Sequence, residues 1–246
     1  MTLDLGMHSL HKNGSLLMTL YCPFWMLNKT GLLLAYKNSD ENILHHPGHY
    51  EGPILFSFNA KHFFGKKKTS IRVESGEWSE KFSLDVAGSS GVIACKWHKM
   101  IYQIGVQNQL TFNSLTKQVT FTPYYVIINN APFPVECQEN DRPADKWVTV
   151  NPESCSALWP KSEMTEKLLK VRVGGDCTSP FLYTESHTTL LKVENNFGGI
   201  NVDIQLTEGA TYINLAAYEI GSAPALLINH STFPIEFWEK NSIQKR

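Results

Sequence analysis

The sequence predicts an all-β fold, built from tandem antiparallel β-sandwich repeats of about 100 residues each. Three observations lead to this prediction: an internal repeat of that period, short apolar runs with two-residue alternation, and frequent turn signals. A chain of 246 residues has room for two such domains. With 42% hydrophobic and 18% charged residues, it can bury a sizeable core, so the composition argues against disorder.

The repeat is centred on an asparagine that follows two apolar residues. Its copies are Asn28, Asn129 and Asn229, spaced about 100 residues apart. A small residue follows each asparagine at the second position. An amide at the end of a strand can bond to neighbouring backbone groups or support a left-handed turn. We therefore predict that the asparagines stabilise the repeats, with direct contact to a bound ligand as the alternative.

A large apolar residue lies four positions after each asparagine, namely Leu32, Phe133 or Phe233. An open sheet edge can accept an extended partner segment as an added strand, and proline-containing segments suit this mode because they are already extended. We regard these three residues as a candidate peptide groove. The alternative is that they fill the core.

The repeat also fixes the predicted domain boundaries. Residues 1–20 are expected to be the tail of a preceding repeat. Residues 21–121 and 122–222 are the first and second sandwich repeats, and residues 223–246 are the first hairpin of a third. Alternation of apolar and polar residues, as in 200–206, indicates strands with one face buried and one face in water.

Charge and cysteine content narrow the class of protein. The net charge of -1 gives the chain no overall attraction to nucleic acid or to anionic membranes. Five widely spaced cysteines without a CxxC motif predict neither a disulfide framework nor a zinc site, so we expect reduced, mostly buried thiols in a cytosolic chain. We find no signal peptide and no apolar stretch of about 18 residues that could cross a membrane.

Two further clusters are candidate sites. Lys66, Lys67 and Lys68 follow two phenylalanines, and the loop Phe63–Lys68 could contact anionic lipid headgroups; a solvated turn is the alternative. Three histidines within residues 45–49 lack an obvious fourth ligand, so we expect a solvated loop rather than a metal centre. The sequence also lacks the glycine-rich, nucleophile-elbow and HExxH motifs of enzymes. We therefore predict no enzymatic activity, no metal and no cofactor.

Two segments carry a family resemblance. They are the run Tyr21-Cys22-Pro23-Phe24-Trp25-Met26-Leu27-Asn28-Lys29-Thr30-Gly31-Leu32 and the run Trp78-Ser79-Glu80-Lys81-Phe82-Ser83-Leu84-Asp85. This pattern resembles the vacuolar-protein-sorting-thirteen family of chorein-like, bridge-like lipid-transfer proteins. Within that family it is similar to the adaptor-binding domain, also called the SHORT-ROOT-binding domain. The resemblance covers essentially the whole chain.

The resemblance implies a non-enzymatic module that binds Pro-x-Pro segments of membrane-anchored adaptor proteins. Such a module would bring its parent lipid-transfer protein to organelle membranes, as a cytoplasmic, peripheral protein at contacts of the endoplasmic reticulum with mitochondria, lipid droplets or endosomes. The family carries a key asparagine in each repeat, which corresponds here to Asn28, Asn129 and Asn229. Neighbouring repeats of the same chain are further expected partners. The alternatives are a rigid structural spacer or direct binding of anionic lipid through Phe63–Lys68.

Overall fold

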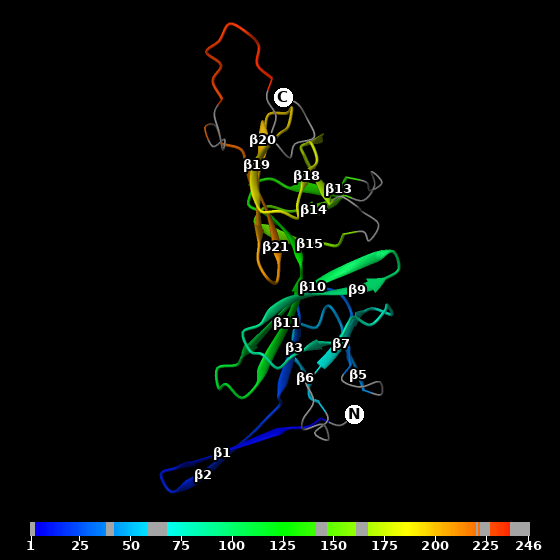
Figure 1. Cartoon of the computed structure of the whole chain (residues 1–246), viewed down its shortest axis with the longest axis vertical. Coiled ribbons are helices and arrows are strands. Elements are labelled where there is room, and N and C mark those ends of the chain that lie inside the picture. Colours follow the sequence, from blue (N-terminus) through cyan, green and yellow to red (C-terminus); the bar gives the residue numbers. More distant parts are fainter. Residues whose placement is uncertain are drawn as a thin grey trace. The chain divides into compact units, whose positions relative to one another are not determined.

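The regular secondary structure of the described residues consists of strands, and none of these residues lies in a helix. The computed structural model describes residues 3–37, 42–58, 68–140, 147–160, 167–219, 221 and 227–236. The chain divides into two compact units, Met1–Tyr124 and Tyr125–Arg246 (Figure 1). The predicted all-β fold class is confirmed.

The first unit is a sandwich of two sheets. The five-stranded sheet has the order β6-β3-β11-β10-β9, formed by β3 (Phe24–Asn28), β6 (Ile54–Phe56), β9 (Ser90–Trp97), β10 (Met100–Leu110) and β11 (Lys117–Pro123). The four-stranded sheet has the order β5-β4-β7-β8, formed by β4 (Leu34–Lys37), β5 (Ile43–His46), β7 (Lys68–Val73) and β8 (Phe82–Ser83).

The second unit has the same plan. Its first sheet has the order β15-β12-β21-β20-β19, formed by β12 (Tyr125–Asn129), β15 (Ser154–Leu158), β19 (His187–Lys192), β20 (Gly199–Leu206) and β21 (Thr211–Ala217). Its second sheet has the order β14-β13-β16-β17, with β18 also pairing with β16; the strands are β13 (Val135–Glu139), β14 (Val148–Val150), β16 (Leu168–Val173), β17 (Asp176–Cys177) and β18 (Phe181–Leu182).

One strand pair in each five-stranded sheet is parallel. β3 runs parallel to β11, with Phe24 opposite Lys117, and β12 runs parallel to β21, with Tyr125 opposite Thr211. The other ladders of both units are antiparallel. The five-stranded sheets are therefore mixed, whereas the smaller sheets are antiparallel. Alternation in the sequence indicates which face of a strand is buried, but it does not distinguish the direction of the neighbouring strand.

The core of each unit lies between its two sheets. In β16, every second residue is buried, which is the alternation expected of a strand with one apolar face. In the first unit, Tyr36 of β4 stacks on Phe121 of β11, with ring centroids 5.2 Å apart and planes inclined by 25°. Both rings are fully buried, so this contact joins the two sheets directly.

The cysteines are all free thiols and fall into two groups. Cys22, Cys95 and Cys137 are buried, whereas Cys155 and Cys177 are exposed. Burial raises the pKa of Cys95 and of Cys137 to about 12, because the interior disfavours the charged thiolate. The three buried thiols thus act as small apolar core residues.

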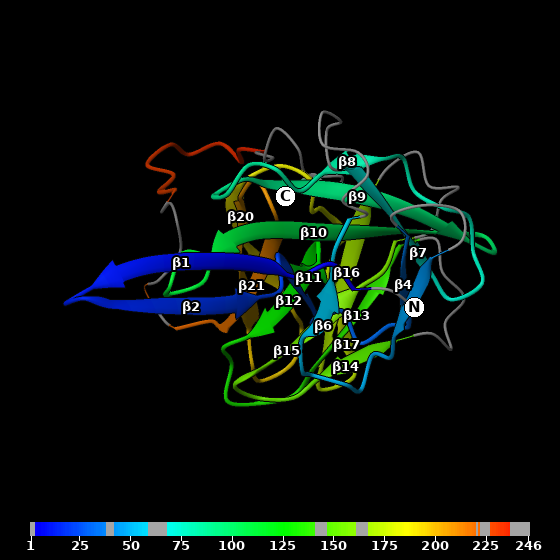
Figure 2. The ribbon, with the colours of Figure 1, turned by 90° about the horizontal axis from the view of Figure 1, so that it is seen from below.

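A separate hairpin precedes the first sandwich. Strands β1 (Gly6–Lys12) and β2 (Ser15–Tyr21) pair with each other, and within the described residues they join no other sheet (Figure 2). Asn13 and Gly14 form its two-residue turn, with φ of 49° and 77°, as the Asn-Gly pair favours. Apolar residues of the hairpin are largely exposed, among them Met7 (61%) and Leu20 (68%).

Candidate functional site

The repeated asparagine of the first unit is buried and makes hydrogen bonds with all of its polar groups. Asn28 Nδ2 donates to the carbonyl oxygens of Leu32 (2.7 Å) and His46 (3.2 Å). Its Oδ1 accepts from the backbone nitrogen (3.0 Å) and hydroxyl (2.6 Å) of Thr30. An amide has two N–H donors and two acceptor lone pairs, so the hydrogen-bonding capacity of Asn28 is used within the fold.

The second unit repeats this arrangement. Asn129 is also buried, and its Nδ2 donates to the carbonyl oxygens of Phe133 (2.9 Å) and Val150 (3.0 Å). Its Oδ1 accepts from the backbone nitrogen of Ala131 at 2.9 Å. The third copy keeps the local part: Asn229 donates to the carbonyl of Phe233 (2.8 Å) and accepts from the backbone nitrogen of Ser231 (2.8 Å), but it is exposed.

Asn28 and Asn129 each make one hydrogen bond that the described contacts of Asn229 do not include, and this bond crosses from one sheet to the other. Asn28 lies in the five-stranded sheet of its unit, and the carbonyl of His46 belongs to β5 at the edge of the other sheet. Asn129 in β12 reaches Val150 in β14 in the same way. Each buried asparagine therefore closes its own turn and ties the two layers of its sandwich together at one point.

The candidate groove residues occupy three different environments. Leu32 and Phe133 are half-buried, and Phe133 packs on Phe197 with ring centroids 4.4 Å apart. Phe233 is 75% exposed. The strands that follow the first two residues, β4 and β13, are interior strands with a neighbour on each side. Strand β4, and Glu136 and Cys137 of β13, are therefore already paired on both sides, so a partner strand cannot add at these residues.

The lysine cluster is only partly within the described residues. Lys66 and Lys67, together with residues 63–65 of the same loop, lie outside them. Lys68 is the first residue of β7, where it is exposed and opposite Ser83 of β8.

The histidine segment differs from the solvated loop that we expected. His45 and His46 belong to strand β5, and His46 is fully buried. The Nδ1 of His46 lies 2.9 Å from the hydroxyl of Tyr36, and its Nε2 lies 3.2 Å from the carbonyl oxygen of Tyr50. Burial lowers the pKa of His46, and the carbonyl contact opposes that shift. The prediction was wrong because three imidazoles in five residues suggested a polar loop, whereas one of them is a hydrogen-bonded core residue.

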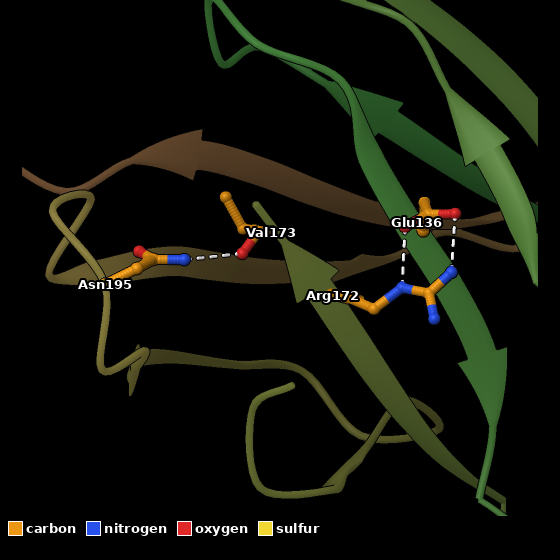
Figure 3. Close-up of polar contacts among 4 residues, drawn as sticks. All are labelled: Glu136, Arg172, Val173 and Asn195. Carbon is orange, nitrogen blue, oxygen red and sulfur yellow. Dashed lines mark hydrogen bonds and ion pairs between the residues drawn. The ribbon is translucent and has the colours of Figure 1, made fainter. Parts of the chain in front are cut away.

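An ion pair in the second unit was not predicted. Arg172 of β16 lies opposite Glu136 of β13 and binds it through two bonds, Nε to Oε2 at 2.6 Å and Nη2 to Oε1 at 2.7 Å (Figure 3). The bonds from Arg172 lower the pKa of the Glu136 carboxyl. The guanidinium carbon of Arg172 also lies 4.4 Å from the ring centroid of Trp147.

A second bond in the same region connects the sheets of this unit. Asn195, in the turn between β19 and β20, donates from Nδ2 to the carbonyl of Val173 at 2.6 Å (Figure 3). Val173 ends β16, so this bond holds the end of one sheet to a turn of the other. Because the partners are 22 residues apart, sequence spacing alone gave no indication of it.

An apolar pair is exposed at one edge of the first unit. Trp25 of β3 lies directly opposite Leu55 of β6, and β6 is the outermost strand of the five-stranded sheet. Trp25 is 37% exposed and Leu55 is 42% exposed. The corresponding pair in the second unit, Val126 opposite Ala157, is smaller and half-buried. The first unit thus presents a large aromatic and an aliphatic side chain beside a sheet edge to which no other described strand is paired.

Comparison with known proteins identifies the family. The family model described as vacuolar-sorting associated protein 13, adaptor binding domain, matches residues 1–246. The chain belongs to this family. It is similar to the mouse intermembrane lipid transfer protein VPS13A, with 35% identity over 237 residues, and to human VPS13C, with 35% identity over 240 residues. Human VPS13D is a more distant relative, with 26% identity over 273 residues.

These alignments cover 96%, 95% and 95% of this chain, respectively, but only 7%, 6% and 6% of the VPS13 relatives. The predicted family resemblance is confirmed, and the matched region is the adaptor-binding domain of lipid transfer proteins. In the part of the chain that the structure describes, no helix has the length and apolar character needed to cross a membrane.

Proposed function

We propose that this chain is a non-enzymatic docking module that binds adaptor proteins and thereby brings its parent lipid-transfer protein to organelle membranes. The observation that carries the proposal is the match of the whole chain to the VPS13 adaptor-binding domain. The adaptors are membrane-anchored and present Pro-x-Pro segments. The parent acts from the cytoplasmic side, at contacts of the endoplasmic reticulum with mitochondria, lipid droplets or endosomes.

The docking position that the geometry favours is the β6 edge of the first unit. An edge strand leaves backbone N–H and C=O groups free to pair with an extended segment, and exposed side chains beside it give affinity and specificity. Trp25 and Leu55 supply these side chains. Tryptophan is frequent among the residues that dominate binding energy at interfaces. A proline-containing segment loses little conformational freedom when it pairs there.

The repeat boundaries form part of the same proposal. Residues 1–20 complete a preceding repeat, 21–121 and 122–222 are the two full repeats, and 223–246 open a third. The exposed apolar residues of the β1–β2 hairpin and the exposed Asn229 turn support this assignment. Met7 and Leu20 would be covered by the preceding repeat, because exposed apolar surface of this extent is a common sign of a missing partner.

The direct test measures binding of fluorescent, capped peptides that contain a Pro-x-Pro segment, using anisotropy with the entire chain. A twin peptide with both prolines replaced by alanine is the peptide control. The double variant Trp25→Ala, Leu55→Ser is expected to bind at least about tenfold more weakly. The matched control is Val92→Ser on β9, which removes a 43% exposed apolar side chain at the opposite edge of the same sheet.

Each result of this test bears on one part of the proposal. Absence of binding by the unmodified chain would overturn recognition of Pro-x-Pro segments and favour a role as a rigid spacer. Equal loss in the Val92→Ser variant would overturn the β6 position. Flotation of the chain with anionic vesicles at low salt, abolished at high salt, would instead favour direct lipid binding through Phe63–Lys68.

A further inference from the structure

The two units differ at one arginine position of the smaller sheet. Arg72 in β7 and Arg172 in β16 are equivalent, since each precedes a buried valine and faces the strand that follows the repeated asparagine. The residue opposite Arg172 is Glu136, whereas the residue opposite Arg72 is Ala35. The second unit therefore carries a carboxylate opposite its arginine, whereas the equivalent position of the first unit holds an alanine.

The second unit shows what this position can bind. The guanidinium of Arg172 is held against Trp147 and receives the Glu136 carboxylate through two short bonds (Figure 3). The planar fork of an arginine matches the two oxygens of a carboxylate, and such paired bonds are among the stronger polar contacts in proteins. The bonds to Glu136 thus show how an arginine at this position binds a carboxylate.

In the first unit the equivalent guanidinium, that of Arg72, has no glutamate opposite it. Arg72 Nε is buried, and among the described residues it has no hydrogen-bond partner. The guanidinium carbon lies 4.7 Å from the ring centroid of Trp78, and Lys37 Nζ lies 4.5 Å from the same centroid. Two positively charged groups therefore lie close to the indole ring of Trp78. Burying an N–H group without an acceptor is unfavourable, so such a group calls for an explanation.

We propose that Arg72, stacked on Trp78 beside Lys37, binds the carboxylate of an aspartate or glutamate in a protein partner. The incoming carboxylate takes the role that Glu136 has in the second unit. The inference rests on the proposed function, because it gives the chemistry of one side chain of the adaptor. The guanidinium is already oriented by the indole, so less side-chain freedom is lost on binding.

The charge of the site favours an acidic segment over a neutral one. Ala35 contributes no negative charge opposite Arg72, whereas Glu136 contributes one opposite Arg172. A carboxylate brought to this place gains charge-assisted hydrogen bonds that a neutral amide of the same shape does not match. The β6 edge lies in the other sheet of this unit, so the two positions are separate contacts.

The experiment follows the side-chain Nε–H resonances of Arg72 and Arg172 in the entire chain during titration with a capped peptide, acetyl-Ser-Ser-Glu-Ser-Ser-amide. The twin peptide with glutamine at the centre is the control, and a second titration uses inorganic phosphate. The expected result is a saturable shift of the Arg72 signal with the glutamate peptide only. The Arg172 signal should stay in place because its carboxylate is internal.

Two variants make the test decisive. Ala35→Glu supplies the missing carboxylate within the chain, and Arg72→Gln removes the charge; each is expected to weaken binding of the glutamate peptide at least about tenfold. Lys68→Gln, which removes an exposed charge from the same strand, is expected to change affinity less than twofold, roughly. Should Ala35→Glu fail to fold, the Arg72→Gln variant carries the comparison.

The inference is overturned if the glutamate and glutamine peptides act alike, if phosphate gives the stronger response, or if Arg72→Gln binds like the unmodified chain. Failure of the proposed function has a different signature. An adaptor that binds unmodified chain and Arg72→Gln equally supports docking while overturning the carboxylate contact. A saturable Arg72 shift in a chain that binds no adaptor supports the carboxylate site while overturning the docking role.

Discussion

Replacing Asn129 with alanine tests whether this residue stabilises the sandwich or contacts a ligand. The substitution removes the bonds to the carbonyls of Phe133 and Val150 and to the backbone nitrogen of Ala131. Asn129 is fully buried, so water cannot easily replace these bonds. We expect the variant to be less stable without any change in the residues exposed at the sheet edges.

The size of the effect follows from the number of bonds. Each hydrogen bond contributes about 1 kcal/mol net, and groups left buried without a partner add to the loss, so Asn129→Ala should lower the free energy of unfolding by about 3 kcal/mol. That is a large fraction of the roughly 5–15 kcal/mol that stabilises an ordinary domain. Asn229→Ala removes similar local bonds at an exposed turn, where water competes, and should cost less than about 1 kcal/mol.

Urea unfolding followed by circular dichroism measures both variants, and peptide anisotropy at a low denaturant concentration measures binding by the folded fraction. If Asn129 acts through the fold, stability falls while the affinity of the folded fraction is unchanged. The reasoning would be refuted if Asn129→Ala unfolded at the same urea concentration as the unmodified chain. Loss of affinity at unchanged stability would instead place Asn129 in contact with the ligand.

Three further predictions concern titration, charge and thiol reactivity. Burial lowers the pKa of His46 from 6.5, so the unfolded chain binds a proton more readily than the folded chain does. The contribution of His46 to stability should therefore be complete above about pH 6.5 and decrease as the pH falls below it. The urea midpoint should drop between pH 7.5 and pH 5, and the drop should be smaller in the His46→Gln variant than in the unmodified chain. Glu136→Gln should cost about 1 kcal/mol or less, since the pair with Arg172 is part-exposed, and the cost should shrink in high salt; a salt-independent cost would contradict an electrostatic origin. A thiol-reactive dye should label Cys155 and Cys177 in the native chain and the remaining thiols only after unfolding; rapid native labelling of a third thiol would count against the buried core.

The sequence predicted local features better than contacts between distant strands. Two-residue alternation identified β strands, and the small residue after Asn28 fits the turn in which Oδ1 accepts from Thr30. The bond from Asn28 to the carbonyl of His46 depends on how the two sheets meet, and no spacing rule specifies that meeting. The contact of His46 with the Tyr36 hydroxyl depends instead on the pairing of β4 with β5 in one sheet, which residue spacing does not specify either.

The candidate binding residues also depend on strand order and register, which the sequence did not predict. Trp25 is part of the motif that predicted the family. Its exposure beside a sheet edge depends on the place of β6 in the sheet order, which the motif does not specify. The bonds between Glu136 and Arg172 join residues 36 positions apart, which only the register of β13 on β16 brings together. The contrast between Arg172 and Arg72 likewise depends on strand register, which places Glu136 opposite one arginine and Ala35 opposite the other.

The parallel pairing of β3 with β11 also has a mechanical consequence. The chain enters β3 at Phe24 and leaves β11 at Pro123, at opposite ends of one hydrogen-bonded ladder, and β12 with β21 repeats this geometry. Tension on the chain would slide the two strands along each other, so that all bonds of the ladder bear the load together. A ladder loaded from one end would instead break bond by bond. We therefore expect each unit to resist unfolding when the chain is pulled from both ends.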